Sequence, residues 1–216
     1  MPELIAPPQK NMFSAYGVWL FKEKHPEVIK IKKDVVPSAH GDRHWDSSFL
    51  IMDYFTNNKP AKKIRVLDVG CGWGPTSIFF ARRDCHVTGM DIDKDVFPFL
   101  DAQADVNGVK IKKLARAMKD MRKKDLANFD IIVGGDICFW DALADEWFSM
   151  LKRAAQAGVK SLVLADPGRS PFFALIKKCS LQWPTEQLVW YALEPKKTSG
   201  YLMVTRLNKI VTRFNR

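Results

Sequence analysis

The sequence predicts a protein of the α/β class, with a mostly parallel sheet that carries helices on both faces. From residue 64 onward, short apolar runs alternate with longer segments of helical periodicity, and repeated strand–helix units produce parallel sheets. The last two apolar runs, residues 187–193 and 201–207, are joined instead by a short polar segment. This pair predicts an antiparallel hairpin at the end of the sheet.

The alternating units follow one another along the chain as βα repeats. The glycines after residues 107 and 157 stand where a left-handed residue commonly ends a helix. We expect strands at 64–69, 86–91, 109–114, 129–135 and 160–165, and helices at 75–83, 94–107, 142–157 and 172–178.

The region before residue 64 has a weaker pattern. Residues 1–10 contain three prolines and indicate a loose tail. Residues 12–24 predict a short amphipathic helix, although Gly17 weakens it, and residues 28–36 alternate enough for a strand or hairpin arm. Residues 41–48 then predict a loop that leads into a buried helix at 49–55, which is apolar nearly all round.

The length of 216 residues suits one domain, and the composition (47% hydrophobic, 27% charged) is ordinary for a globular protein. No apolar run approaches the roughly 18 residues of a membrane span. The start lacks the basic and apolar regions of a signal peptide. We therefore expect a cytoplasmic protein with an N-terminal extension at 1–45 and a single domain at 46–216.

The cysteines and histidines do not form a metal-binding pattern. No two cysteines have C-x-x-C spacing, so we expect reduced thiols rather than disulfides or a zinc site. The histidines lack ligand spacing as well, and we expect no metal. The residues concerned are Cys71, Cys85, Cys138, Cys179, His25, His40, His44 and His86.

The formal net charge is +10, with basic clusters at 62–63, 110–113, 119–124, 177–178 and 196–197. These clusters indicate either solvated surfaces or attraction to an acidic partner, protein or nucleic acid. The run 119–124 contains no aromatic residue, so it is not typical of a surface that stacks single-stranded bases.

The most informative motif is the glycine-rich segment that follows the first predicted strand. Gly70, Gly72 and Gly74 allow the backbone to bend sharply and to lie close to a ligand. About twenty residues later the second predicted strand ends at Asp91, whose carboxylate can accept hydrogen bonds from both ribose hydroxyls. This spacing predicts a site for an adenosine-containing cofactor. The alternative is a turn that only links strand to helix.

The glycine spacing distinguishes between cofactors. Dinucleotide sites use G-x-G-x-x-G, but Pro75 stands at the third glycine position and suits a first helical turn. An NAD-dependent dehydrogenase is therefore disfavoured. With Asp68 two residues before Gly70, the segment resembles motif I of the class I S-adenosylmethionine (SAM) methyltransferases. That resemblance implies a Rossmann-like, doubly wound, seven-stranded sheet with an antiparallel terminal hairpin, and SAM as the cofactor.

The same resemblance implies a set of cofactor-binding residues. The glycine turn would approach the methionine part of SAM, Asp91 would hold the ribose, and the stretch after the third strand would contact the adenine. The expected residues are Trp45, Asp68, Gly70, Cys71, Gly72, Gly74, Asp91, Ile92, Ala117, Met118 and Asp136.

A second motif follows the fourth predicted strand. Asp136-Ile137-Cys138-Phe139 resembles the [D/E]-x-x-[F/Y] motif of the seven-stranded protein-lysine methyltransferases, a group that includes electron-transfer-flavoprotein and chaperone modifiers. Residues 41–48, around Trp45, are similar to that group's G-x-x-x-W-[D/E/P]-[S/A]-[S/A] stretch, and residues 166–169 resemble a loop in some members. The resemblance implies a protein substrate, with Asp136 and Phe139 as catalytic residues.

These residue types suit methyl transfer, because in-line displacement depends mainly on positioning and desolvation. Asp136 would hold the incoming amine or act as a base. If the segment is helical, Phe139 lies on the same face, and its ring, with Trp140 or Trp45, would stabilise a cation. The alternatives are core packing for the three aromatic residues and an N-cap of the next helix for Asp136.

The sequence leaves other functions open. Base-amino methyltransferases carry [D/N/S]-P-P-[Y/F/W] after strand four, whereas residues 136–139 contain no proline. Cytosine-C5 enzymes need a Pro-Cys pair, but Ile137 precedes Cys138. The fold equally supports small-molecule N- or O-methylation. A non-catalytic binding module is the last alternative, although it has no need of Asp68, Asp91 and Asp136.

Overall fold

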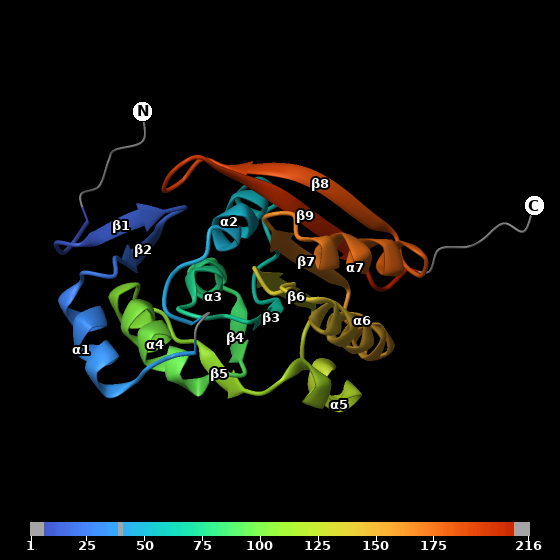
Figure 1. The fold of residues 1–216 in the computed structure, drawn as a ribbon, viewed down its shortest axis with the longest axis horizontal. Coiled ribbons are helices and arrows are strands. Elements are labelled where there is room, and N and C mark those ends of the chain that lie inside the picture. The colour runs from blue at the N-terminus through green and yellow to red at the C-terminus, as the bar shows by residue number, and fades with distance from the viewer. Residues whose placement is uncertain (1–6, 39–40, 210–216) are drawn as a thin grey trace, which may run out of the picture.

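The computed structural model describes residues 7–38 and 41–209. Within them, a seven-stranded sheet has the order β5-β4-β3-β6-β7-β9-β8 (Figure 1). Strands β3 to β7 are parallel, and β9 and β8 complete the sheet as an antiparallel hairpin, so the predicted fold class is confirmed. The strands are β3 (Arg65–Val69), β4 (His86–Asp91), β5 (Lys112–Ala115), β6 (Ile131–Gly135), β7 (Ser161–Asp166), β8 (Thr185–Ala192) and β9 (Thr198–Arg206).

Helices cover both faces of the sheet because its central strands bury alternate side chains on each side. Val66 of β3 packs into the apolar core beneath one set of helices, and Leu67 packs into the core beneath the other. The first set contains α2 (Ser47–Asn57), α3 (Pro75–Ala81) and α4 (Phe97–Val106), and the second contains α5 (Lys123–Leu126), α6 (Asp141–Gln156) and α7 (Ser170–Ser180).

The order of the strands creates a crevice at one edge of the sheet. From β3 the chain runs outward through β4 and β5, and it then returns to β6 on the opposite side of β3. The connections after β3 and β6 therefore diverge, and open α/β sheets bind ligands at such a switch point.

The N-terminal region differs from the sequence prediction. Residues 12–24 are not helical but contain an antiparallel hairpin of β1 (Met12–Ala15) and β2 (Val18–Phe21). Tyr16 and Gly17 connect the strands with φ angles of 50° and 77°. Positive φ at both central residues is the geometry of a tight hairpin turn, so Gly17 belongs to the turn between strands rather than to a helix.

The second difference is helix α1 (Pro26–Asp34), where a strand was expected at 28–36. The imidazole of His25 accepts a hydrogen bond from the Glu27 amide at the start of this helix. Pro26 stands in the first turn, and basic side chains lie in the last turn. These start and stop signals outweigh the partial alternation of apolar residues.

The hairpin packs on α4. The Trp19 amide donates to Asn107 Oδ1 at 2.9 Å, and Asn107 Nδ2 donates back to the Trp19 carbonyl at 2.7 Å. The Phe21 amide donates to Gln103 Oε1 at 3.1 Å. These bonds tie the expected extension to the sheet domain, and the boundary after residue 45 stays a prediction. Residues 1–6 of the expected tail, His40 and residues 210–216 of the expected domain lie outside the described residues.

Among the described helices, none combines the length and the apolarity that crossing a membrane requires. All four cysteines are buried as free thiols. A cytoplasmic location stays a prediction.

Candidate functional site

The glycine turn leaves β3 in a left-handed conformation. Gly70, Gly72 and Gly74 have φ angles of 66°, 50° and 80°, which side chains with a Cβ rarely adopt. A Cβ added to Gly72 would meet nothing within 4 Å, whereas one added to Gly74 would lie 2.0 Å from Leu100 Cδ1. Gly74 is therefore needed for packing, and Gly72 leaves open space beside the turn.

Asp91, the last residue of β4, lies directly beside this turn. Its Oδ2 accepts a hydrogen bond from the Gly72 amide at 3.0 Å, and its Oδ1 accepts one from the Asp93 amide at 3.0 Å. Burial raises the pKa of Asp91, and these two amide bonds oppose that shift. A carboxylate has about four acceptor positions, so Asp91 keeps capacity for ligand hydroxyls.

A cleft of about 110 Å³ lies between the ends of these strands. It is smaller than the 300–1,000 Å³ typical of ligand pockets, so a nucleoside ligand would extend beyond its enclosed part. Five of the predicted cofactor residues line it: Gly70, Asp91, Ile92, Ala117 and Met118.

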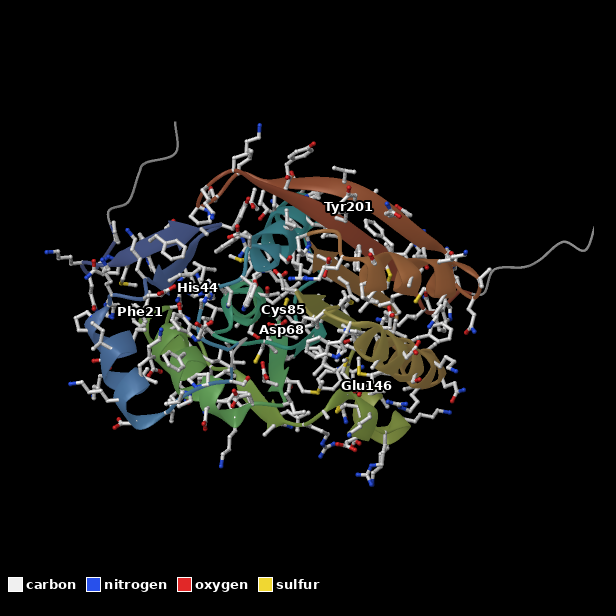
Figure 2. All side chains as sticks on the ribbon, in the orientation of Figure 1. Phe21, His44, Asp68, Cys85, Glu146 and Tyr201 are labelled. Atoms are coloured by element: carbon white, nitrogen blue, oxygen red, sulfur yellow. The ribbon has the colours of Figure 1, made fainter. Side chains whose placement is uncertain are left out.

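The side chains of Asp68 and Cys71 point away from the cleft. Asp68, near the middle of the molecule in Figure 2, is 3% exposed and accepts a hydrogen bond from Ser77 Oγ at 2.6 Å. Burial raises the pKa of Asp68 to about 7, with the Asp91 charge adding to the shift and the Ser77 bond opposing it. The buried Cys71 sulfur packs against Gly89. Both side chains hold the turn in place.

A second group of predicted residues gathers after β6, around Asp136. Asp136 Oδ2 accepts a hydrogen bond from the Ser47 amide at 3.2 Å, and Oδ1 accepts one from Arg169 Nη1 at 2.9 Å. The same Arg169 nitrogen lies 2.8 Å from Asp166 Oδ2. The suggestion that Asp136 caps the following helix is wrong: Trp140 holds that position, and Asp136 instead binds the first turn of α2.

Phe139 joins this group through the same arginine. The Arg169 guanidinium lies 4.5 Å from the centre of the Phe139 ring, in a cation–π contact. The Trp45 ring stands edge-on to Phe139 at 6.1 Å, and the half-exposed Trp140 lies 5.6 Å away. The expectation of a helical turn from Asp136 to Phe139 is wrong, because Asp136 has φ = 58° and α6 begins at Asp141.

Arg169 belongs to the loop 166–169 noted in the sequence, but no role was predicted for its side chain. Its pairing with Asp136 joins residues 33 apart in the chain, which no local pattern reveals. The available signal was its place in the loop after β7, next to β6 in the sheet. With both carboxylates ionised, Asp136, Asp166 and Arg169 sum to a charge of −1, so the group favours a nearby cation.

The two parts of the site adjoin one another. A Cβ on Gly70 would lie 2.5 Å from Ile137 Cγ2, so the segment after β6 packs directly on the glycine turn. The cleft at the ends of β3, β4 and β5 and the segment that carries Asp136 therefore both adjoin the glycine turn, at the switch point of the sheet.

This strand order, with a glycine turn after the first parallel strand and an acidic residue ending the second, is the arrangement expected from the resemblance to the class I SAM-dependent methyltransferases. Comparison with known proteins agrees. Residues 66–158 match the family model described as "Methyltransferase domain". Residues 66–158 therefore match a methyltransferase domain, and an enzyme that uses SAM as its methyl donor is the class that this match and the fold support.

Individual relatives differ in their substrates. The chain is 32% identical over 81 residues to a ubiquinone biosynthesis O-methyltransferase of Xylella fastidiosa (strain 9a5c), covering 38% of this chain and 33% of that protein. It is 26% identical over 139 residues to the electron transfer flavoprotein beta subunit lysine methyltransferase of Danio rerio, covering 63% and 53%. The chain thus spans between a third and about half of these curated relatives.

A solved structure with the same fold is the magnesium protoporphyrin IX methyltransferase (ChlM) from Synechocystis PCC 6803 with bound SAM. Its TM-score is 0.53 at 15% sequence identity, covering 83% of this chain and 89% of that one. At this identity the likeness concerns the fold alone.

Proposed function

We propose that this chain transfers a methyl group from SAM to the side-chain amine of a protein lysine. The observation that carries the proposal is the group of Asp136, Asp166, Arg169 and Phe139 beside the glycine turn. Its net charge of −1 and its aromatic ring suit a cationic amine more than an anionic or neutral acceptor. The lysine methyltransferase of Danio rerio aligns with the chain over 139 residues, and ubiquinone biosynthesis O-methyltransferases align over 81 to 129 residues.

In this proposal, the cleft and the turn hold SAM. Asp91 accepts the ribose hydroxyls, Ile92, Ala117 and Met118 surround the adenine, and the backbone of Gly70–Gly74 follows the methionine part. The open space at Gly72 supports this placement, because a side chain at this position would occupy the space beside the turn that the methionine part of SAM needs. Asp68 and Cys71 act indirectly, by holding the turn. When bound, SAM supplies a methyl group activated by a sulfonium.

The role of Asp136 is then to position the acceptor. Both of its oxygens already accept a hydrogen bond, from Ser47 and Arg169. In this proposal Asp136 provides negative charge that attracts the ammonium form of the lysine. The ammonium would lose its proton to water before reaction, and the neutral nitrogen would then form its bond to the methyl carbon as the S–C bond breaks and S-adenosylhomocysteine leaves. Phe139 and Trp45 would limit the access of water to the reacting nitrogen.

A groove of about 470 Å³ provides room for the peptide around the lysine. It lies between the β1–β2 hairpin and the β8–β9 connection, and Phe13, Arg43, Asp46 and Pro195 are among its lining residues. Two of these, Arg43 and Asp46, flank Trp45 in the chain. Acceptor residues next to the lysine would occupy this groove.

Small-molecule O-methylation is the second candidate, favoured by the 32% identity to the ubiquinone pathway enzyme. The test is to incubate the protein with SAM labelled in its methyl group and host lysate, followed by protease, nuclease or organic extraction. We expect protease-sensitive, nuclease-resistant label that acid hydrolysis releases as methyl-lysine. Extractable label would favour the small-molecule candidate. Nuclease-sensitive label would indicate RNA, and SAM binding without any label would indicate a non-catalytic module.

A further inference from the structure

Among residues 7–38 and 41–209, no long helix covers one face of the sheet at β4 and β5, where a crossover normally places one. The connection from β5 to β6 contains only a three-residue 3-10 helix (Met118–Asp120) and the four-residue helix α5, whereas β6 and β7 are joined by the 16-residue helix α6. A groove of about 690 Å³ occupies this place. We call this cavity the β5 groove, and its polar lining includes Arg65, His86, Thr88, Lys110, Lys112 and Arg116.

The side chains on this face of the sheet are polar where the groove exposes them. On β4, His86 and Thr88 point to the same face as the buried Met90, which packs under α6. Lys112 has the same relation to Leu114 on β5. The face is thus apolar where helices cover it and polar where they do not. This pattern indicates that the opening belongs to the fold.

The β5 groove has an excess of positive charge. Arg65 pairs with Asp130 at 3.0 Å, and Arg116 pairs with Asp125 at 3.2 Å. Lys110 and Lys112 are exposed, and neither has an ion-pair partner among the described residues. Both belong to the basic cluster at 110–113, which the proposed methyl transfer does not use.

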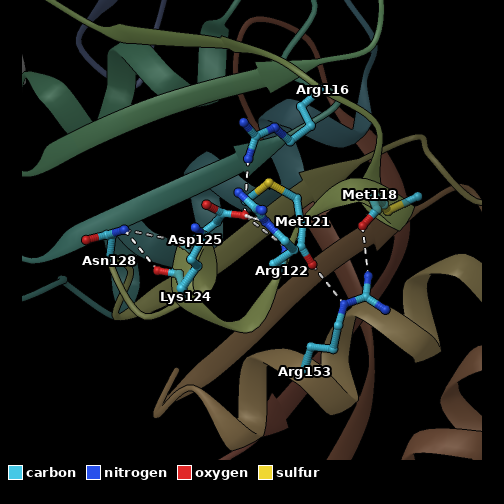
Figure 3. A network of polar contacts seen from close by, with 8 residues as sticks. All are labelled: Arg116, Met118, Met121, Arg122, Lys124, Asp125, Asn128 and Arg153. Atoms are coloured by element: carbon cyan, nitrogen blue, oxygen red, sulfur yellow. Dashed lines mark hydrogen bonds and ion pairs between the residues drawn. The ribbon is translucent and has the colours of Figure 1, made fainter.

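The wall opposite β5 is held rigidly (Figure 3). Asp125 accepts hydrogen bonds from the Arg122 backbone and side chain at 3.1 and 3.2 Å, in addition to its ion pair with Arg116. Arg153 of α6 donates to the carbonyl oxygens of Met118 and Met121 at 2.9 and 2.8 Å. A pre-formed wall lowers the ordering cost of binding a ligand.

We propose that the β5 groove binds an extended acidic segment of a partner protein. Carboxylates complement Lys110 and Lys112, and β5 is an edge strand of the described sheet, which an extended peptide can join through its backbone. Residues 110–116 would span about 20 Å at roughly 3.3 Å per residue, which matches about six residues of extended peptide. This inference does not depend on the identity of the methyl acceptor.

The lining favours a protein segment over nucleic acid. Asp125 lies in the groove wall, where it would repel a phosphate backbone. Phe129 in the lining is only 9% exposed and offers little surface for stacking, which leaves the imidazole of the exposed His86 as the accessible ring among the described lining residues. Leu114, which is partly exposed, adds aliphatic surface that suits the side chains of a peptide.

The test measures fluorescence anisotropy of a fluorescein-labelled decaglutamate peptide titrated with the full chain. We expect saturable binding that weakens as salt is raised. The double variant Lys110→Glu/Lys112→Glu should bind at least about tenfold more weakly. Its matched control is Lys33→Glu/Lys177→Glu, exposed positions on α1 and α7 that change the net charge by the same amount. The control should bind within about twofold of wild type.

Three results would overturn the proposal: no binding by the wild type, equal losses in both double variants, or tighter binding of a decauridylate RNA that displaces the peptide. Circular dichroism and SAM titration of both variants check that the fold is intact. Because the peptide is measured without SAM or an acceptor, failure of the lysine proposal leaves this result unaffected.

Discussion

At the scale of single residues, the hydrogen-bond partners of Asp136 fix the position of its carboxylate. Its two oxygens bind α2 and the loop after β7, so one carboxylate both joins elements and contributes charge to the acceptor site. We predict that Asp136→Asn keeps SAM binding but lowers turnover about 100-fold. The amide retains an acceptor for a hydrogen bond, but the charge of the group with Asp166 and Arg169 changes from −1 to zero, and the interaction lost is a charged one.

Calorimetry measures the affinity for SAM, and the initial rate of methyl transfer to the acceptor, once that acceptor is identified, measures turnover. Asp141→Asn, at the exposed start of α6, is the matched control and should react like wild type. Undiminished turnover in Asp136→Asn would show that its carboxylate charge is not needed.

The raised pKa of Asp68 predicts how the free energy of unfolding depends on pH. Because burial raises the pKa of Asp68 to about 7 in the folded protein, the folded state binds more protons than the unfolded state between pH 4 and pH 7. The free energy of unfolding should therefore fall as pH rises through this range, by about 2–3 kcal/mol from this residue between pH 5 and pH 8. Asp68→Asn should lack this component. Urea unfolding at both pH values measures it, and identical pH dependence in the two proteins would contradict it.

At the scale of elements, some helices, strands and turns follow from local sequence patterns, and others depend on contacts between distant parts of the chain. The strand at 86–91 and the glycine turn were predicted correctly, because apolar runs and closely spaced glycines are local signals. The hairpin at 12–21 was missed, because its turn is Tyr-Gly rather than a strong turn pair such as Asn-Gly. The Arg169–Asp136 pair was missed because only the sheet order brings the two loops together.

The hairpin turn supplies a prediction at this scale. Gly17 has φ = 77° and no atom within 4 Å of an added Cβ, so Gly17→Ala strains only the backbone. It should lower the free energy of unfolding by about 1–2 kcal/mol. Gly17→Asn should cost less, because asparagine tolerates left-handed angles better. Urea denaturation of the three proteins decides this, and equal stability of the alanine and asparagine variants would count against the turn geometry.

At the scale of the whole molecule, the site exists only because three strands end at one edge. The turn after β3, Asp91 at the end of β4 and Met118 after β5 line or adjoin one cleft, and the loop after β6 covers the turn. The acceptor group then stands beside the cofactor residues, while the β5 groove opens on a sheet face that the short α5 leaves uncovered. The molecule thus combines the proposed methyltransferase site with a basic groove on another part of the sheet.

The most direct measurement is calorimetric titration of SAM into the wild type, Gly72→Arg and Gly158→Arg. Both glycines have positive φ and open space around them, but only Gly72 adjoins the cleft, so Gly158→Arg controls for backbone strain and added charge. We predict one SAM per chain for the wild type and Gly158→Arg, and no detectable binding for Gly72→Arg. Equal SAM affinity in all three proteins, or binding of NAD in place of SAM, would contradict the assignment of this cleft.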